Sequence, residues 1–114
     1  MRTYVAPVYE KDDNISAPVV DITNGTTVGF RYLQFGANSP KTVTVCMNAK
    51  ADVRVNVRVD AYDGKQIAAM DCTPGAGEFT APVNAGVIGK HAVYFEFVSG
   101  QEGAIAEFDR FTFD

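Results

Sequence analysis

The chain has 114 residues and a formal net charge of −4, a length that predicts one domain with no room for a separate catalytic half. It contains 15 Val, nine Thr and eight Phe against a single Leu and no Trp, which favours strands and excludes a helical bundle. An acidic chain with no apolar run approaching about 18 residues is not expected to bind nucleic acid or to contact or cross a membrane.

The N-terminal half contains four predicted segments in chain order. Residues 3–9 predict a first strand, residues 10–16 a polar loop, and residues 28–35 a longer strand. Residues 41–48 alternate between apolar and smaller or polar side chains, as a strand with one buried face does. The predicted inner face of this last strand consists of Val43, Val45 and Met47.

The clearest strand covers residues 52–60, where four valines alternate with Arg54, Asn56 and Arg58. Residues 67–72 and 91–98 predict two further strands. The last strand, residues 104–114, brings Glu107 and Asp109 to one face because they lie two positions apart. The same spacing predicts that Phe111 and Phe113 share a face and that Phe108 lies on the opposite one.

Turn signals such as Asn24-Gly25 and Asp63-Gly64 recur every 8 to 12 residues or so, which is typical of a sandwich or barrel. Residues 75–77 (GAG) also predict a turn, because no helix follows that could complete a phosphate-binding loop. We therefore predict an all-β fold in one domain, 1–114. It would be an antiparallel two-sheet β-sandwich of jelly-roll topology with about eight or nine strands.

Few residues suggest catalysis. His91 is the single histidine, lies at a predicted strand start, and has no visible nucleophile or orienting acid beside it. Cys46 and Cys72 are expected to be buried free thiols, and a disulfide between them requires their strands to adjoin. We expect no catalytic residues in this chain.

Tyrosines are the best binding candidates. The apolar face of a sugar ring stacks on aromatic planes, and nearby amides and carboxylates bond its hydroxyls. Tyr32, Tyr62 and Tyr94 all lie near predicted strand ends or on polar faces.

Three stretches, in order, resemble a family 6 carbohydrate-binding module over residues 19–114. The first is residues 27–36 (TVGFRYLQFG) with the strand after it, residues 42–45 (TVTV). The second is residues 52–72, from the valine-rich strand through the Asp63-Gly64 turn to Cys72. The third comprises residues 89–98 (GKHAVYFEFV) and 107–113 (EFDRFTF).

The resemblance implies a jelly roll that binds a plant polysaccharide such as xylan or arabinoxylan and performs no chemistry. It resembles the modules found C-terminal to family 43 glycoside hydrolases. A secreted or cell-surface location as part of such an enzyme follows, although residues 1–5 lack a signal-peptide pattern. The alternative is a structural accessory domain of a glycoside hydrolase that has lost sugar binding.

The resemblance also implies site residues. Tyr32 matches the first of two stacking aromatics, and Glu107 stands where the family has a sugar-bonding Asn. The second aromatic would fall near Ala76. The family's structural calcium ion uses a first-strand acidic pair, where residues 9–11 (YEK) stand here, and a last-strand Asp that corresponds to Asp109. Cys72 matches a family cysteine whose usual partner is missing, which favours a free thiol.

Overall fold

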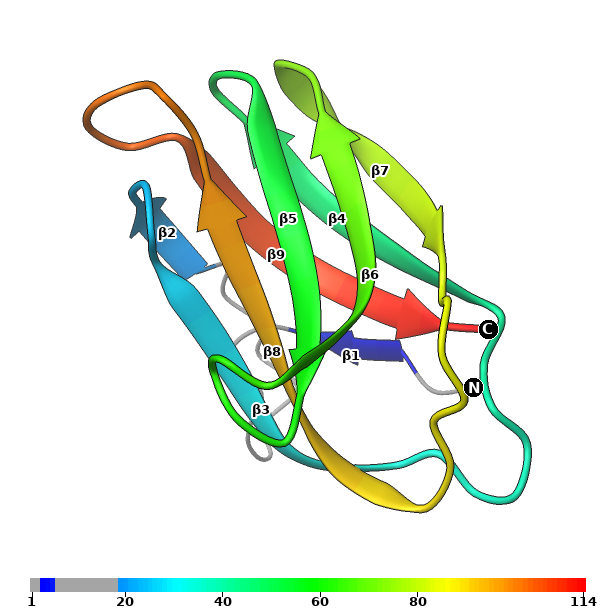
Figure 1. Ribbon diagram of the computed structural model, residues 1–114. Coiled ribbons are helices and arrows are strands. Elements are labelled where there is room, and N and C mark those ends of the chain that lie inside the picture. The colour runs from blue at the N-terminus through cyan, green and yellow to red at the C-terminus, as the bar shows by residue number, and fades with distance from the viewer. Residues whose placement is uncertain (1–2, 6–18) are drawn as a thin grey trace.

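The fold is a sandwich of two antiparallel sheets, seen in a computed structural model that describes residues 3–5 and 19–114 (Figure 1). Within these ranges no helix has the length and hydropathy needed to cross a membrane. The described strands are β1 (Thr3–Val5), β2 (Val19–Ile22), β3 (Thr27–Gln34), β4 (Thr42–Ala49), β5 (Val53–Val59), β6 (Lys65–Cys72), β7 (Gly75–Pro82), β8 (Lys90–Val98) and β9 (Ala106–Phe113).

The strand order confirms the predicted jelly roll. The first sheet runs β1-β9-β4-β7, and β2 also pairs with β9. The second sheet runs β3-β8-β5-β6. Strands β2 to β9 therefore form the orders 2-9-4-7 and 3-8-5-6, the two facing sheets of an eight-stranded jelly roll, to which β1 is added.

The core lies between the sheets and is built by strand alternation. The four valines of β5 all face inward and are buried, as predicted. Phenylalanines from both sheets meet at the centre, where the ring centroid of Phe95 lies 5.1 Å from Phe108 and 4.8 Å from Phe111. This burial of large apolar side chains drives the two sheets together.

A bulge in β9 corrects the prediction for Phe108. Cys46 on β4 pairs with Arg110 while the next residue, Met47, pairs with Phe108, so Asp109 is an extra residue in β9. The extra residue shifts the alternation by one position. Phe108, Phe111 and Phe113 are consequently all fully buried on one face, and the prediction that Phe108 lies on the opposite face is wrong.

The prediction of a turn at residues 75–77 is also wrong. These residues begin β7, whose Gly75 pairs with Ala49 and whose Gly77 pairs with Met47. Most of β7 is exposed, so it lacks the apolar alternation by which strands are recognised in a sequence. Strand β2 was likewise not predicted. At the N-terminus β1 confirms the first three residues of the predicted strand 3–9, whereas residues 6–16 lie outside the described residues.

The two cysteines are free and buried, as expected. Cys46 lies on β4 of the first sheet with its side chain on the outer face, whereas Cys72 lies in the core on β6 of the second sheet. Because the Cys46 side chain points out of the sandwich and that of Cys72 points into the core, the two thiols do not meet, and the alternative of a disulfide between them is wrong.

Candidate functional site

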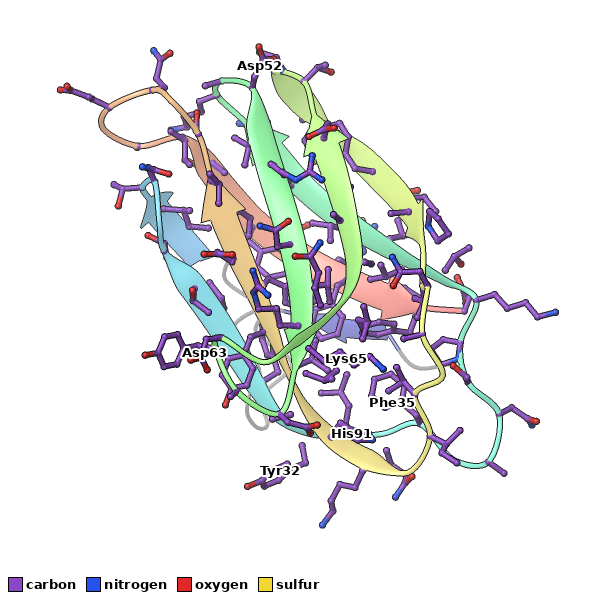
Figure 2. The ribbon with its side chains drawn as sticks, viewed as in Figure 1. Tyr32, Phe35, Asp52, Asp63, Lys65 and His91 are labelled. Carbon is purple, nitrogen blue, oxygen red and sulfur yellow. The ribbon has the colours of Figure 1, made fainter. Side chains whose placement is uncertain are left out.

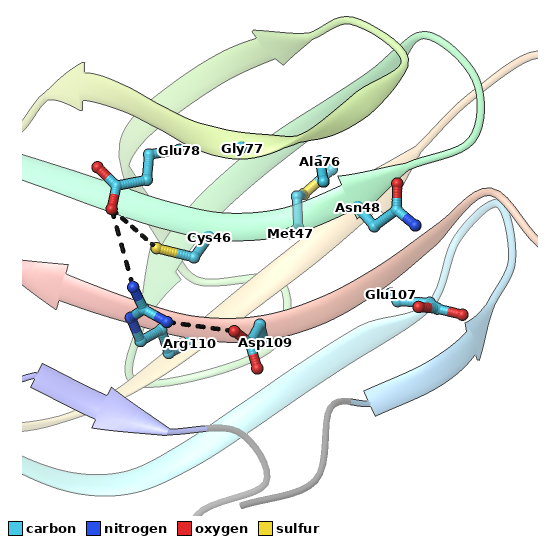
Figure 3. A pocket seen from close by; sticks show the side chains of 9 residues that line it. All are labelled: Cys46, Met47, Asn48, Ala76, Gly77, Glu78, Glu107, Asp109 and Arg110. Carbon is cyan, nitrogen blue, oxygen red and sulfur yellow. Dashed lines mark hydrogen bonds and ion pairs between the residues drawn. The ribbon is translucent and has the colours of Figure 1, made fainter.

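A pocket of about 320 Å³ opens on the outer face of the first sheet, where β4, β7 and β9 lie side by side (Figure 3). Alternation places one side chain from each strand in a row, because Asn48 pairs with both Ala76 and Glu107. The next row contains Glu78, Cys46 and Arg110. The described lining residues are Cys46, Met47, Asn48, Ala76, Gly77, Glu78, Glu107, Asp109 and Arg110.

Charged groups connect the walls of this pocket. The Arg110 guanidinium lies 3.8 Å from a Glu78 carboxylate oxygen and 3.3 Å from an Asp109 carboxylate oxygen. The Cys46 thiol donates a hydrogen bond of 3.7 Å to Glu78. Burial, more than the neighbouring carboxylates, raises the pKa of the Cys46 thiol and keeps it protonated, which suits a hydrogen-bond donor and not a nucleophile.

The pocket offers hydrogen bonds to a polyhydroxylated ligand. Asn48 supplies an amide, and Glu107, which also lies 3.4 Å from the Lys50 ammonium, supplies carboxylate oxygens. Of the described residues that line the pocket, none is aromatic. Ala76 and Gly77 stand on the β7 side of the pocket instead. The described lining residues therefore offer no ring on which a sugar could stack.

The structure brings together some of the predicted site residues and separates others. Glu107, Asp109 and the Ala76 position all line the pocket, and the two carboxylates share one face as expected. Tyr32 lies elsewhere, near the end of β3 in the second sheet. Tyr32 and His91 lie at one end of the sandwich, and Asp52 lies at the opposite end (Figure 2). Lys50, two residues before Asp52, forms an ion pair with Glu107 at that opposite end. Tyr32 and Glu107 therefore do not form one site.

Sequence reasoning missed three residues of the pocket: Asn48, Glu78 and Arg110. Each is a polar residue that faces outward from a strand, which is common on any sandwich. The signal that unites them is the register of β4 with its two neighbours, and pairing between distant strands cannot be seen in a single sequence.

The described residues do not fit a calcium site at Asp109. Calcium prefers six or more oxygen ligands, yet the Asp109 carboxylate forms an ion pair with the Arg110 guanidinium, a cation. Among the residues that the structure describes, no group of three His, Cys, Asp or Glu side chains could hold a metal ion. The first-strand ligands expected at residues 9–11 lie outside the described residues.

Comparison with protein families decides the identity of this β-sandwich. A model of the family "Carbohydrate binding module (family 6)" matches residues 6–114. The chain belongs to this family. Modules of the family are non-catalytic binding domains, so the chain is a carbohydrate-binding module and not an enzyme. A comparison with curated protein sequences found no match.

Solved structures share the fold of this module. A family 43 arabinoxylan arabinofuranohydrolase from Bacillus subtilis, in complex with cellotetraose, aligns with a TM-score of 0.78 and 23% identity. The alignment covers 97% of this chain and 23% of that enzyme. A family 6 module from Clostridium cellulolyticum, in complex with xylose, aligns with a TM-score of 0.76 and 20% identity over 97% of this chain and 89% of that one.

A third similar structure holds a metal ion. It is the carbohydrate-binding module CBM36 in complex with calcium and xylotriose, with a TM-score of 0.71 and 14% identity over the whole of both chains. At this identity the likeness concerns the fold, and the calcium belongs to that protein.

Proposed function

We propose that the module binds a neutral plant polysaccharide of the xylan or arabinoxylan type and thereby holds an attached glycoside hydrolase at its substrate. The similar structure that contains xylose, and the arabinoxylan-degrading enzyme of which the chain spans 23%, support this substrate class and this partner. Attachment to such an enzyme would place the module outside the cell or on its surface.

The observation that carries the proposal is the pocket of Asn48 and Glu107. Its amide and carboxylate lie in one row across three strands, so strand pairing fixes their spacing before a ligand arrives. Three acidic side chains line the pocket, and the cations beside them are the Arg110 guanidinium and the Lys50 ammonium. The remaining excess of one negative charge disfavours uronic acids. A neutral sugar with several hydroxyl groups fits these contacts best.

Binding by this pocket requires no chemistry. Sugar hydroxyls exchange their hydrogen bonds to water for bonds to fixed protein groups, a net gain of about 1 kcal/mol for each bond. A pocket of this kind binds weakly by itself. When the module is linked to a catalytic domain, even weak binding raises the effective concentration of that domain at the polysaccharide.

Calorimetric titration of the full chain with xylohexaose, arabinoxylan oligosaccharides, cellohexaose and oligogalacturonate tests the proposal. We expect binding of the neutral xylan oligosaccharides, a loss of about tenfold or more with Glu107→Ala, and no change with Glu102→Ala. Glu102 is a matched control because it is an exposed glutamate in the loop before β9. Failure of every neutral glycan to bind at millimolar concentration would contradict the proposal.

A structural accessory domain is the second candidate function. The observation that favours it is the absence of an aromatic side chain among the described lining residues of the pocket. In this case deletion of the module would lower the thermal stability of the attached hydrolase and leave its affinity for polysaccharide unchanged. Unchanged thermal stability together with a weaker affinity for polysaccharide would favour carbohydrate binding.

A further inference from the structure

Strand β7 is an edge of the first sheet that lacks the usual protection against the addition of another strand. It ends the order β1-β9-β4-β7, and among the described strands it pairs with β4 alone (Figure 1). Its register with β4 continues without a bulge over all of Gly75–Pro82. Proteins commonly protect such an edge with lysines, bulges or covering segments. Strand β7 contains neither lysine nor arginine.

The two edge strands of the second sheet are protected. Strand β3 has a bulge between Phe30 and Leu33 in its pairing with β8. Strand β6 begins with Lys65. The Ile67 carbonyl of β6 accepts a hydrogen bond of 2.8 Å from the Asn84 backbone N–H, so the segment after β7 covers part of the free edge of β6. The bare, regular edge of β7 therefore differs from both.

Backbone groups of every second β7 residue point away from β4. Thr42 of β4 exchanges two backbone hydrogen bonds with Asp114, on the β9 side, so the next residue, Val43, bonds on the β7 side. Val43 pairs with Ala81, and Ala81 and every second residue before it consequently bond to β4. The described residues of β7 whose N–H and C=O groups both point to the free edge are Ala76, Glu78 and Thr80.

We propose that two copies of the chain associate through their β7 edges, in an antiparallel pair centred on Phe79. In this register Glu78 lies opposite Thr80 of the other copy, and these two residues exchange two backbone hydrogen bonds. Ala76 lies opposite Pro82, so the Ala76 N–H donates to the Pro82 carbonyl, and the missing N–H of proline falls at the end of the pair. The first sheets of the two copies then form one continuous sheet.

Side chains favour this register over its neighbours. Phe79 faces inward and packs against the core, yet it is only partly buried at this edge of the sandwich. Pairing centred on Phe79 places the two rings in a non-hydrogen-bonded pair, where Cα atoms lie about 4.5 Å apart and aromatic side chains attract. A register centred on Glu78 would oppose two carboxylates, and one centred on Gly77 would place only Gly75 opposite Phe79.

The pairing joins two candidate sugar pockets on one surface. Ala76 and Glu78 line the pocket on the outer face of the first sheet. Residues directly opposite each other in a sheet share a face, so the outer faces of the two copies become continuous. A polysaccharide that reaches both pockets would bind more tightly than a short oligosaccharide. The dimer itself needs no carbohydrate, so this inference goes beyond the proposed function.

Sedimentation velocity of the full chain without carbohydrate, from micromolar to millimolar concentration, tests the pairing. Thr80→Glu places a carboxylate opposite Glu78 of the other copy, whereas Thr80→Lys places an ammonium there. Thr80→Val is the neutral control, since all three variants lose the same 2.8 Å hydroxyl contact with Thr44.

Thr80→Pro tests the backbone bonds of the edge. It removes an N–H that points away from β4, a position where an edge strand tolerates proline. Thermal unfolding of each variant verifies that it folds.

We expect a reversible dimer for the unchanged chain and for Thr80→Val. Dimerisation should weaken about threefold to tenfold with Thr80→Glu, strengthen by a similar factor with Thr80→Lys, and disappear with Thr80→Pro. A monomer at millimolar concentration, or equal dimerisation by a folded Thr80→Pro variant, would overturn the pairing of β7 edges. Equal dimerisation by Thr80→Glu and Thr80→Lys would overturn the register centred on Phe79. The proposed function is tested separately by Glu107→Ala and stands or falls without the dimer.

Discussion

The ring of Tyr94 packs directly against the backbone of Gly29 on the neighbouring strand. A Cβ at Gly29 would lie 2.6 Å from Cε1 and 2.8 Å from Cδ1 of this ring, closer than nonbonded carbon atoms approach. Gly29 thus allows Tyr94 to lie flat across β3. The pair gives a way to displace the Tyr94 ring without removing it.

Substitution Gly29→Ala should move the Tyr94 ring off β3. Relief of backbone entropy when a strand glycine is replaced, about 0.5–1 kcal/mol, offsets part of the steric cost. We therefore expect the free energy of unfolding to change by no more than about 1 kcal/mol, while the near-ultraviolet circular dichroism of the tyrosines changes as the ring moves. Gly100→Ala is the control, because a Cβ there meets nothing within 4 Å. Identical spectra for the two variants would contradict the close packing of Tyr94 on Gly29.

His91 links two loops at the end of the sandwich that carries Tyr32. Its Nδ1 lies 2.8 Å from an Asp60 carboxylate oxygen and its Nε2 lies 2.8 Å from the Ile88 carbonyl oxygen. Because both partners are hydrogen-bond acceptors, these contacts favour the protonated form of the ring. The hydrogen bond to Asp60 is the largest cause that raises the pKa of His91 above 6.5, opposed by burial and assisted by the Ile88 carbonyl.

Stability should therefore fall as pH rises from below 6.5 through the folded pKa of His91. Because the folded state raises the His91 pKa, its stabilisation is complete below the ordinary value of 6.5 and is lost as pH rises through the folded value. Urea unfolding at a series of pH values should show this decline in the unchanged chain and a flatter profile for His91→Gln. A rise in stability over the same interval would contradict the assignment.

Asp60→Asn tests the cause of this pKa shift. Asp60 has a left-handed backbone with φ of 75°, which Asn also tolerates, so the change removes the charge and keeps the turn. The pKa of His91, followed by its ring proton resonances in NMR, should move down toward 6.5. An unchanged pKa in this variant would mean that Asp60 does not hold the imidazolium.

The two thiols should differ in their accessibility to alkylation. Cys46 is 8% exposed at the pocket, whereas Cys72 is 2% exposed in the core, where burial raises its pKa to about 12. Mass spectrometry after treatment with iodoacetamide should show slow native labelling at Cys46 and labelling of Cys72 only in denaturant. Faster native labelling at Cys72 than at Cys46 would contradict the placement of these strands.

Periodicity predicted much of the fold because it depends on neighbouring residues. The alternating valines of β5 and the inner face of β4 are where the sequence places them, since a half-buried strand needs only period two. The bulge at Asp109 is different. It arises from the register between β9 and β4, and no local pattern around Asp109 announces an extra residue.

The site was less predictable than the fold for the same reason. Ala76 and Glu107 share a pocket because both strands pair with β4 at Asn48, a relationship between residues about 30 positions apart. Tyr32 was expected beside Glu107 and lies on the other sheet. Motif order along the chain indicates the family, but only strand pairing decides which motif residues meet.

The most direct test of carbohydrate binding by this module is the amide NMR spectrum of the full chain during titration with xylohexaose. We predict shifts at the pocket around Asn48, Ala76 and Glu107. A spectrum that remains unchanged with xylohexaose and with cellohexaose at millimolar concentration would contradict carbohydrate binding by this module.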